Sequence, residues 1–179
     1  MNRDTFMTYI DRFNRADLEG LRPFWAADVE LRLPPGQIGG PARLMHGADE
    51  IIRSYRKSFE FIHERLRIDY LAIDGECIAA EMYTEFEAHR DHPGFSMRPL
   101  RKGDVFVMTN FVHYDLKDDL FWRIRVARFT QDATRCAPLT PSSVGRHMAP
   151  CFEPRRRSPS RRARSPSPRS RPRKRSSSG

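Results

Sequence analysis

The stretch TNFVHYDLKDDLFWRIRVARF, from Thr109 to Phe129, carries the strongest fold signal in the sequence. Two runs alternate apolar and polar residues and are joined by a short acidic turn, which is the pattern of a β-hairpin. On the first strand Asn110 and Tyr114 share a face with Val112, because side chains alternate along a strand. The hairpin therefore predicts a sheet whose inner face is mostly apolar but carries a few polar side chains.

The same alternation extends upstream of this hairpin. Residues 66–73 (LRIDYLAI) and 77–88 (CIAAEMYTEFEA) alternate, and the DGE between them is a hairpin signal. Residues 28–36 (DVELRLPPG) are typical of an earlier strand that stops at a Pro-Pro-Gly turn, and residues 36–47 (GQIGGPARLMHG) are typical of a loop. Consecutive long strands with short turns curl strongly, so we expect one curved antiparallel sheet.

Three helices are predicted in the first half of the chain. The first has an apolar stripe at i, i+3, i+4 and i+7, and Asp17 can cap a short second one. The third follows Gly47. The stripes consist of Phe6, Tyr9, Ile10 and Phe13 in the first helix and of Ile51, Ile52, Tyr55, Phe59 and Ile62 in the third. Helices followed by strands indicate an α+β fold, a cone with three N-terminal helices packed on the curved sheet.

The net charge of +9 hides two different regions. Residues 155–179 contain ten Arg, one Lys and no acid, so they carry +11. The remaining residues hold 32 − 11 = 21 basic and 23 acidic side chains, a net of −2, with no overall attraction to nucleic acid. We expect a folded domain over 1–130, a Pro/Ser linker over 131–154 and a disordered Arg/Ser-rich tail over 155–179.

The cysteines and the distribution of apolar residues indicate where in the cell the protein is located. Cys77, Cys136 and Cys151 form neither a disulfide framework nor a zinc-ligand spacing, so we expect reduced thiols. No window is apolar and long enough for a membrane span, and charges interrupt the start of the chain where a signal peptide would be apolar. These features predict a cytoplasmic protein that does not contact a membrane.

The order of elements resembles that of the SnoaL-like superfamily. The resemblance covers residues 5–130 and depends on the segments YIDRFNRADLEGLRPFWAADVELRLP (9–34) and HGADEIIRSY (46–55) and on the final hairpin. That superfamily shares the cone-shaped fold of nuclear transport factor 2 and includes polyketide cyclases and ketosteroid isomerases. The resemblance implies an apolar small-molecule ligand, no cofactor, and a homodimer formed through the outer face of the sheet.

A residue-by-residue comparison with ketosteroid isomerases matches the two functional tyrosines of that family but finds no acid at its two carboxylate positions. The tyrosine that donates to the oxyanion in that family falls on Tyr9, and the tyrosine that hydrogen-bonds to it falls on Tyr55. The general-base aspartate falls on Leu33 and the second acid on or near Val112, neither of which can abstract a proton. The last strand, where SnoaL-type cyclases carry a carboxylate base, offers Arg123, Arg125 and Arg128 instead.

Each polar candidate has two interpretations. Tyr9 and Tyr55 are either donors aimed into the cone or core tyrosines. Glu81 or Glu85 replaces the missing base if that face of residues 77–88 lines the cavity. If the apolar residues of the strand face inward, both glutamates lie at solvent or at a dimer interface. Asn110 either orients a ligand oxygen or is a buried amide satisfied by its neighbours.

The predicted catalytic set is therefore Tyr9, Tyr55, Asn110 and Glu81. The two histidines of HRDH (89–92) have no third placed ligand, so no metal site is predicted. The expected wall of the ligand-binding pocket consists of Phe13, Trp25, Leu33, Phe59, Tyr83, Phe106, Met108, Val112 and Trp122.

Two functions fit these features. One is a small-molecule-binding protein that acts as a cofactor-free isomerase, cyclase or dehydratase, by proton transfer on a polyketide- or terpenoid-like substrate. The alternative is a non-catalytic dimeric binding module whose Arg/Ser tail contacts RNA or a nuclear import factor. The RPRKR patch (171–175) resembles an import signal, so the tail would make the protein nuclear.

Overall fold

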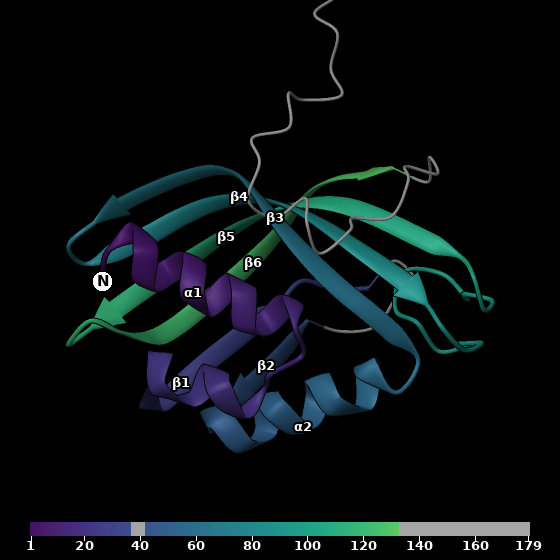
Figure 1. The fold of residues 1–179 in the computed structure, drawn as a ribbon, viewed down its shortest axis with the longest axis horizontal. Coiled ribbons are helices and arrows are strands. Elements are labelled where there is room, and N and C mark those ends of the chain that lie inside the picture. The colour runs from purple at the N-terminus through teal and green to yellow at the C-terminus, as the bar shows by residue number, and fades with distance from the viewer. Residues whose placement is uncertain (37–41, 133–179) are drawn as a thin grey trace, which may run out of the picture. The chain divides into compact units, whose positions relative to one another are not determined.

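The computed structural model describes residues 1–36 and 42–132, so the predictions for the tail and for most of the linker lie outside the described residues. Two short helices and one 3-10 turn precede or interleave with the strands (Figure 1). In chain order the elements are α1 (Arg3–Asn14), η1 (Glu19–Phe24), β1 (Trp25–Leu33), β2 (Arg43–His46), α2 (Gly47–Phe59), β3 (Ile62–Asp74), β4 (Cys77–Ala88), β5 (Val105–Lys117) and β6 (Leu120–Asp132).

The six strands form one curved sheet in the order β2-β1-β6-β5-β4-β3. Figure 1 shows α1 crossing in front of the sheet, and α2 packs against β1, β2 and β3. The predicted α+β cone is therefore confirmed. The sheet is mixed rather than purely antiparallel, because β1 runs parallel to β6 while the other neighbours are antiparallel.

Local chemistry explains where the helices begin. Asn2 caps α1 by accepting from the Thr5 backbone N–H at 2.9 Å, and the predicted apolar stripe of this helix is buried. The second helix is a 3-10 turn that contains Pro23, and Asp17 accepts from the Gly20 N–H at 3.0 Å just before it. At Gly47 the chain turns from β2 into α2 with φ of 75°, which only glycine adopts without strain.

Two boundaries differ from the sequence prediction. Residues 43–46 form β2, which pairs with β1 through Leu33 and Arg43 among others, so this part of the predicted loop is a strand. The helix α2 ends at Phe59, and Ile62 begins β3 rather than completing the apolar face of the helix. Because β3 begins at Ile62, strand alternation places Glu64 on the inner face of the sheet, together with Ile62 and Leu66.

Strand alternation decides which side chains face the helices. On β4 the residues Ile78, Ala80, Met82, Thr84 and Phe86 are buried, and they form the inner face of the strand. The core cluster combines this face with the apolar sides of α1, α2 and η1. The question that the sequence left open for residues 77–88 is therefore answered: the apolar set faces inward and the glutamates face outward.

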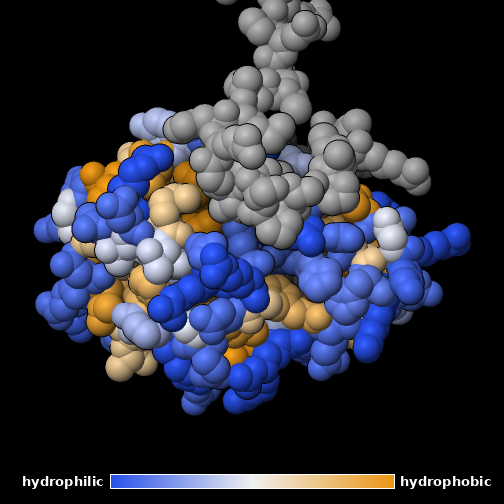
Figure 2. Space-filling model, in the orientation of Figure 1, coloured by the Kyte–Doolittle hydropathy of each residue, from blue (hydrophilic) through white to orange (hydrophobic). Residues whose placement is uncertain are grey.

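The outer face of the sheet is rich in ion pairs. Asp115 accepts from Arg123 at 2.5 Å and from Arg125 at 2.9 Å, and the Nε2 atom of His113 lies 3.0 Å from it. Figure 2 draws the opposite side of the molecule, where α1 lies in front of the sheet, and there hydrophilic side chains surround scattered apolar ones. Within the described residues no helix is long and apolar enough to cross a membrane.

Candidate functional site

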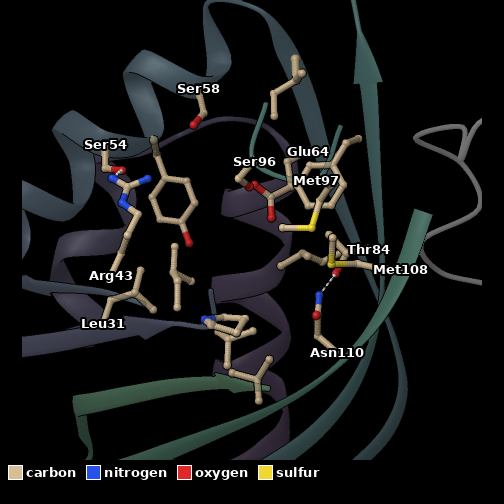
Figure 3. Close-up of a pocket in the computed structure, with 18 of the residues that line it drawn as sticks. Leu31, Arg43, Ser54, Ser58, Glu64, Thr84, Ser96, Met97, Met108 and Asn110 are labelled. Atoms are coloured by element: carbon tan, nitrogen blue, oxygen red, sulfur yellow. Dashed lines mark hydrogen bonds between the residues drawn. The ribbon is translucent and has the colours of Figure 1, made fainter. Parts of the chain in front are cut away.

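A cavity of about 750 Å³ lies between the inner face of the sheet and the helices (Figure 3). Its wall is mainly apolar and includes Phe13, Leu31, Met45, Met82 and Met108. The polar groups of its interior are Tyr9, Tyr55, Glu64, Thr84, Asn110 and Tyr114. An apolar cavity of this size with a few convergent polar groups is typical of a small-molecule site.

Glu64 is the one carboxylic acid among the described residues that line this cavity. It lies on the inner face of β3 between Ile62 and Leu66, and its backbone pairs with Phe86 of β4. Neither a hydrogen bond nor an ion pair joins its carboxyl group to another described residue. Burial in this apolar setting raises the pKa of Glu64 from its ordinary value of 4.5 to about 8. The cavity therefore holds a carboxyl group that can both give and take a proton near neutral pH.

Tyr9 projects from α1 into the cavity and is held by other aromatic rings. Its ring centroid lies 5.0 Å from that of Phe121 and 5.6 Å from that of Phe24, both at steep angles. Burial raises the pKa of Tyr9 strongly. The indole N–H of Trp25 lies beside the hydroxyl and lowers this pKa in part, although the contact falls short of hydrogen-bond geometry. Tyr9 therefore remains a protonated donor.

Tyr55 on α2 and Tyr114 on β5 face the same cavity. Burial is the main cause that raises the pKa of Tyr55, and the negative charge of Glu64 and then Tyr9 add to it. Burial raises the pKa of Tyr114 as well, with Tyr9 and Tyr55 as further causes. These electrostatic effects show that the four groups lie close enough to influence one another. No hydrogen bond joins Tyr9 to Tyr55 within the described part of the chain.

Asn110 lies on the inner face of β5, as the sequence predicted, and is 7% exposed. Its side-chain N–H donates to the Thr84 hydroxyl at 3.0 Å, while its Oδ1 atom is buried without a partner (Figure 3). The Nε1 atom of Trp25 is also buried without a full hydrogen bond. Buried polar atoms that lack partners are uncommon. Three of the four found among the described residues belong to side chains that line this cavity, namely Trp25, Asn110 and Arg128.

The structure brings most of the predicted pocket residues together. Phe13, Trp25, Leu33, Met108 and Val112 line the cavity. The other four predicted wall residues do not line the cavity.

Each of these four lies elsewhere in the fold. Phe59 packs on the rings of Phe13 and Tyr55. Phe106 belongs to the second core cluster with Phe86 and Phe95. The guanidinium group of Arg67 lies over the ring of Tyr83, and that of Arg123 lies over the ring of Trp122.

Glu81 is placed on the opposite face of the sheet from the cavity, opposite Phe111 in the β4–β5 ladder. The odd-numbered residues of β4 share this face, so Glu85 and Tyr83 also lie outside the cavity. Glu85 forms an ion pair with Arg65 at 3.2 Å. The prediction that Glu81 supplies the base at this site is therefore corrected, because strand alternation points its side chain away.

Sequence reasoning missed Glu64, although a signal for it exists. The apolar period of β3 continues from Leu66 back to Ile62, which puts Glu64 between two inward residues. Ile62 also falls three residues after Phe59, so its spacing fitted the third helix equally well. A strand that begins at Ile62 would have shown a carboxyl group on the apolar face.

The histidines of residues 89–92 do not form a metal site in the part of the chain that the structure describes. His92 stacks on Phe61 with ring centroids 4.6 Å apart and lines the cavity, whereas His89 contacts the Phe59 carbonyl oxygen at 3.1 Å. His89 also lies 4.6 Å from the ring of His63. The two histidines of this loop thus have separate surroundings.

Comparison with known proteins supports the fold and the family. The model of the SnoaL-like domain matches residues 7–124, which contain most of α1, all of α2 and most of the sheet. The chain belongs to the SnoaL-like family. The resemblance seen in the sequence is thus confirmed. No curated protein matches this SnoaL-like chain in sequence.

Solved structures with the same fold come from several bacteria. One from Xanthomonas campestris pv. campestris, described provisionally as a polyketide cyclase, is 23% identical with a TM-score of 0.55, and the match covers 68% of this chain and 87% of that one. A SnoaL-like polyketide cyclase from Agrobacterium tumefaciens is 19% identical with a TM-score of 0.55, covering 72% and 93%. A nuclear transport factor 2-like protein of unknown function from Burkholderia pseudomallei is 20% identical with a TM-score of 0.55, covering 72% and 92%. Identities this low establish a shared fold and leave the activity open.

Proposed function

We propose that this SnoaL-like protein is a cofactor-free isomerase, cyclase or dehydratase that transfers a proton on an apolar, oxygenated small molecule, polyketide- or terpenoid-like, with Glu64 as the general base. The observation that carries this proposal is the unpaired Glu64 carboxyl group inside the cavity, with its pKa raised to about 8. Efficient acid–base catalysts have a pKa close to the working pH. Glu64 takes the role that the sequence had assigned to Glu81.

The proposed chemical step is proton abstraction from a carbon next to a carbonyl group. The ionised Glu64 carboxylate takes the proton, the C–H electron pair forms a carbon–carbon double bond, and the carbonyl oxygen becomes an enolate oxygen. Return of the proton from Glu64 to another carbon gives isomerisation. Attack of the enolate carbon on a second carbonyl group of the same molecule gives cyclisation, with the proton passed to the new alkoxide.

Tyr9 is the proposed donor to the enolate oxygen, and Tyr55 assists it. Both hydroxyls stay protonated because burial raises their pKa values, so they can donate rather than ionise. The Trp25 indole beside Tyr9 stabilises negative charge that shifts onto the phenol oxygen. Donors fixed where charge develops lower the barrier most in a dry site, because water does not screen them.

The apolar wall supports this reaction in two ways. It accommodates a substrate of drug-like size, since cavities of about 300 to 1,000 Å³ are usual for such ligands. It also keeps water away from the enolate, which would otherwise be quenched before cyclisation. That the fold is shared with a protein named as a SnoaL-like polyketide cyclase is consistent with this class of substrate.

The alternative function is a non-catalytic dimeric binding module whose basic tail contacts nuclear or RNA partners. One structural observation favours its dimeric part: Phe111 and Phe129 are 43% and 61% exposed, and their tilted rings contact each other with centroids 4.8 Å apart. The +11 charge of residues 155–179 favours contact with acidic polymers. This alternative requires neither Glu64 nor the cavity, so substitutions at Glu64 separate it from the enzymatic proposal.

The test is exchange of α-protons of ketone ligands in D2O, followed by NMR. A panel of aromatic and terpenoid ketones is incubated with the wild type, with Glu64→Gln and with Glu81→Gln as the matched control on the outer face. We expect exchange with the wild type and the control, with a rate that rises with pH and levels off above about 8 as Glu64 ionises. Exchange that persists in Glu64→Gln would show that Glu64 is not the base.

A further inference from the structure

Three cationic side chains line the open end of the cavity, and none pairs with a carboxylate. Arg43 comes from β2, Lys57 from α2 and Arg128 from β6. Arg43 and Lys57 are exposed as well as lining the cavity, which places them at its mouth. Among the side chains described in residues 1–36 and 42–129, no acid lies within ion-pair distance of any of the three.

Elsewhere on the described surface, most arginines have a carboxylate partner. Nine arginines there each form an ion pair with an aspartate or glutamate, so unpaired cations are not simply the rule for this protein. The paired arginines are Arg12, Arg15, Arg22, Arg56, Arg65, Arg67, Arg98, Arg123 and Arg125. Other cations of the described surface, among them Arg32 and Arg53, also form no ion pair. The cavity mouth is distinguished because three such cations line one cavity whose described lining holds a single acid, Glu64.

Two of the three cations, Arg43 and Arg128, lie at the end of β1. Arg43 pairs with Leu33 through the backbone, and its Nη2 atom donates to the Ser54 hydroxyl of α2 at 2.7 Å (Figure 3). Arg128 donates to the Pro35 carbonyl oxygen at 3.1 Å, and its Nε atom is buried without a partner. These bonds hold the two guanidinium groups in place but use only part of their donor capacity.

Nothing inside the cavity neutralises this charge. Glu64 is the sole acid among the described lining residues, and at neutral pH most of it is protonated because burial raises its pKa to about 8. Figure 3 also shows Arg43 and Ser54 on one side of the cavity and Glu64 on the other. A bound molecule can therefore hold a negative group at the mouth and place a carbon at Glu64.

We infer that the substrate of this site carries an anionic group, a carboxylate or a phosphate ester, which Arg43, Lys57 and Arg128 bind at the mouth while its apolar body fills the cavity. The inference rests on the proposed function, since it names the substrate class of that site. Guanidinium groups bind carboxylate and phosphate through paired N–H donors, and the serine hydroxyls at positions 54 and 58 of α2 supply further donors at this rim.

The experiment compares ligands that share an apolar body and differ in charge. 2-Naphthylacetic acid, 2-naphthyl phosphate and the neutral 2-naphthylacetamide are titrated calorimetrically into the full chain at low salt, and the corresponding anthracene compounds extend the series. The variants are Arg43→Gln, Lys57→Gln and the two combined. Arg32→Gln on β1 and Arg53→Gln on α2 are matched controls, because each removes one charge from a neighbouring position that does not line the cavity.

We expect at least one of the two anions to bind the wild type about tenfold more tightly than the amide. This preference should fall to less than about threefold in the double variant and remain in both controls, while affinity for the amide stays unchanged. The tail is present in every protein, so its charge cancels from the comparison. Equal binding of acid, phosphate and amide, binding of none of them, or equal loss in the controls would each overturn the inference.

The titration and the D2O exchange experiment distinguish failure of this inference from failure of the proposed function. Anion preference without proton exchange in D2O would leave the binding inference standing and remove the enzymatic proposal. If neutral ketones exchange their protons and the naphthyl anions neither bind nor inhibit that exchange, the enzymatic proposal stands and the anion-binding inference is removed. Comparison of 2-naphthylacetic acid with 2-naphthyl phosphate then shows which anion the mouth prefers.

Discussion

Glu64 on β3 lies directly opposite Phe86 on β4 in the antiparallel ladder, and both side chains line the cavity. The phenyl ring gives the carboxyl group an apolar neighbour instead of a partner, so the negative form of Glu64 loses solvation without compensation. Across the outer face of the same two strands the pattern is reversed, since Arg65 pairs with Glu85 and Glu87. One hairpin thus pairs Glu85 and Glu87 with an arginine on its outer face and leaves Glu64 unpaired on its inner face.

Glu64→Gln should stabilise the protein at neutral and higher pH. The folded state keeps Glu64 protonated up to about pH 8, whereas in the unfolded chain it loses its proton above its ordinary pKa of 4.5. The unfolded state therefore binds fewer protons between these values, and the free energy of unfolding falls as pH rises through this window. The slope from this group is at most about 1.4 kcal/mol per pH unit.

Urea unfolding of the wild type and of Glu64→Gln between pH 5 and about pH 8.5 measures this effect. The variant should gain stability relative to the wild type as pH rises, and the gap should stop growing above about pH 8. Glu81→Gln on the outer face is the control. A gap that does not change with pH would mean that Glu64 is solvated in the folded protein.

The difference between Glu64 and the other site residues shows what the sequence can reveal. Tyr9, Tyr55 and Asn110 were recognised as candidates, either for the cavity or for the core, because each lies on the apolar face of a predicted helix or strand. Glu64 was hidden because Ile62 fitted both a helix and a strand, and only the end of α2 at Phe59 decides between them. The parallel pairing of β1 with β6 was also beyond local pattern, because it joins segments far apart in the chain.

Tyr9→Phe should lower turnover while leaving stability nearly intact. The hydroxyl of Tyr9 makes no full hydrogen bond within the described residues, so its removal deletes little native interaction, and the ring keeps its contacts with Phe24 and Phe121. Loss of one oxyanion donor typically lowers kcat by about 100-fold. The measurements are kcat for the exchanged ketone and the melting temperature, with Tyr70→Phe at an exposed position as the control. A large fall in melting temperature would identify Tyr9 as a core residue instead.

Asn110→Ala should destabilise the protein, whereas a paired replacement should not. The alanine leaves the buried Thr84 hydroxyl without the donor that now lies at 3.0 Å, at a cost of about 1 to 3 kcal/mol. Replacing both groups with apolar ones of similar shape, as Thr84→Val with Asn110→Leu, removes the polar pair together and should be nearly neutral. A double-mutant cycle followed by thermal unfolding measures the coupling. Additive effects would show that the two side chains do not depend on each other.

Phe111→Glu should separate the subunits if the outer face of the sheet forms the proposed dimer. Phe111 and Phe129 contact each other yet remain exposed, and a charge placed between two such surfaces would be buried without a partner. Sedimentation equilibrium at micromolar concentration measures the mass of the wild type and the variant, and Arg53→Glu, at an exposed residue of α2 away from the outer face of the sheet, is the control. We expect a dimer for the wild type and the control and a single chain for Phe111→Glu. A wild type that sediments as one chain would remove the dimer from the proposal and leave the exposed pair free for another partner.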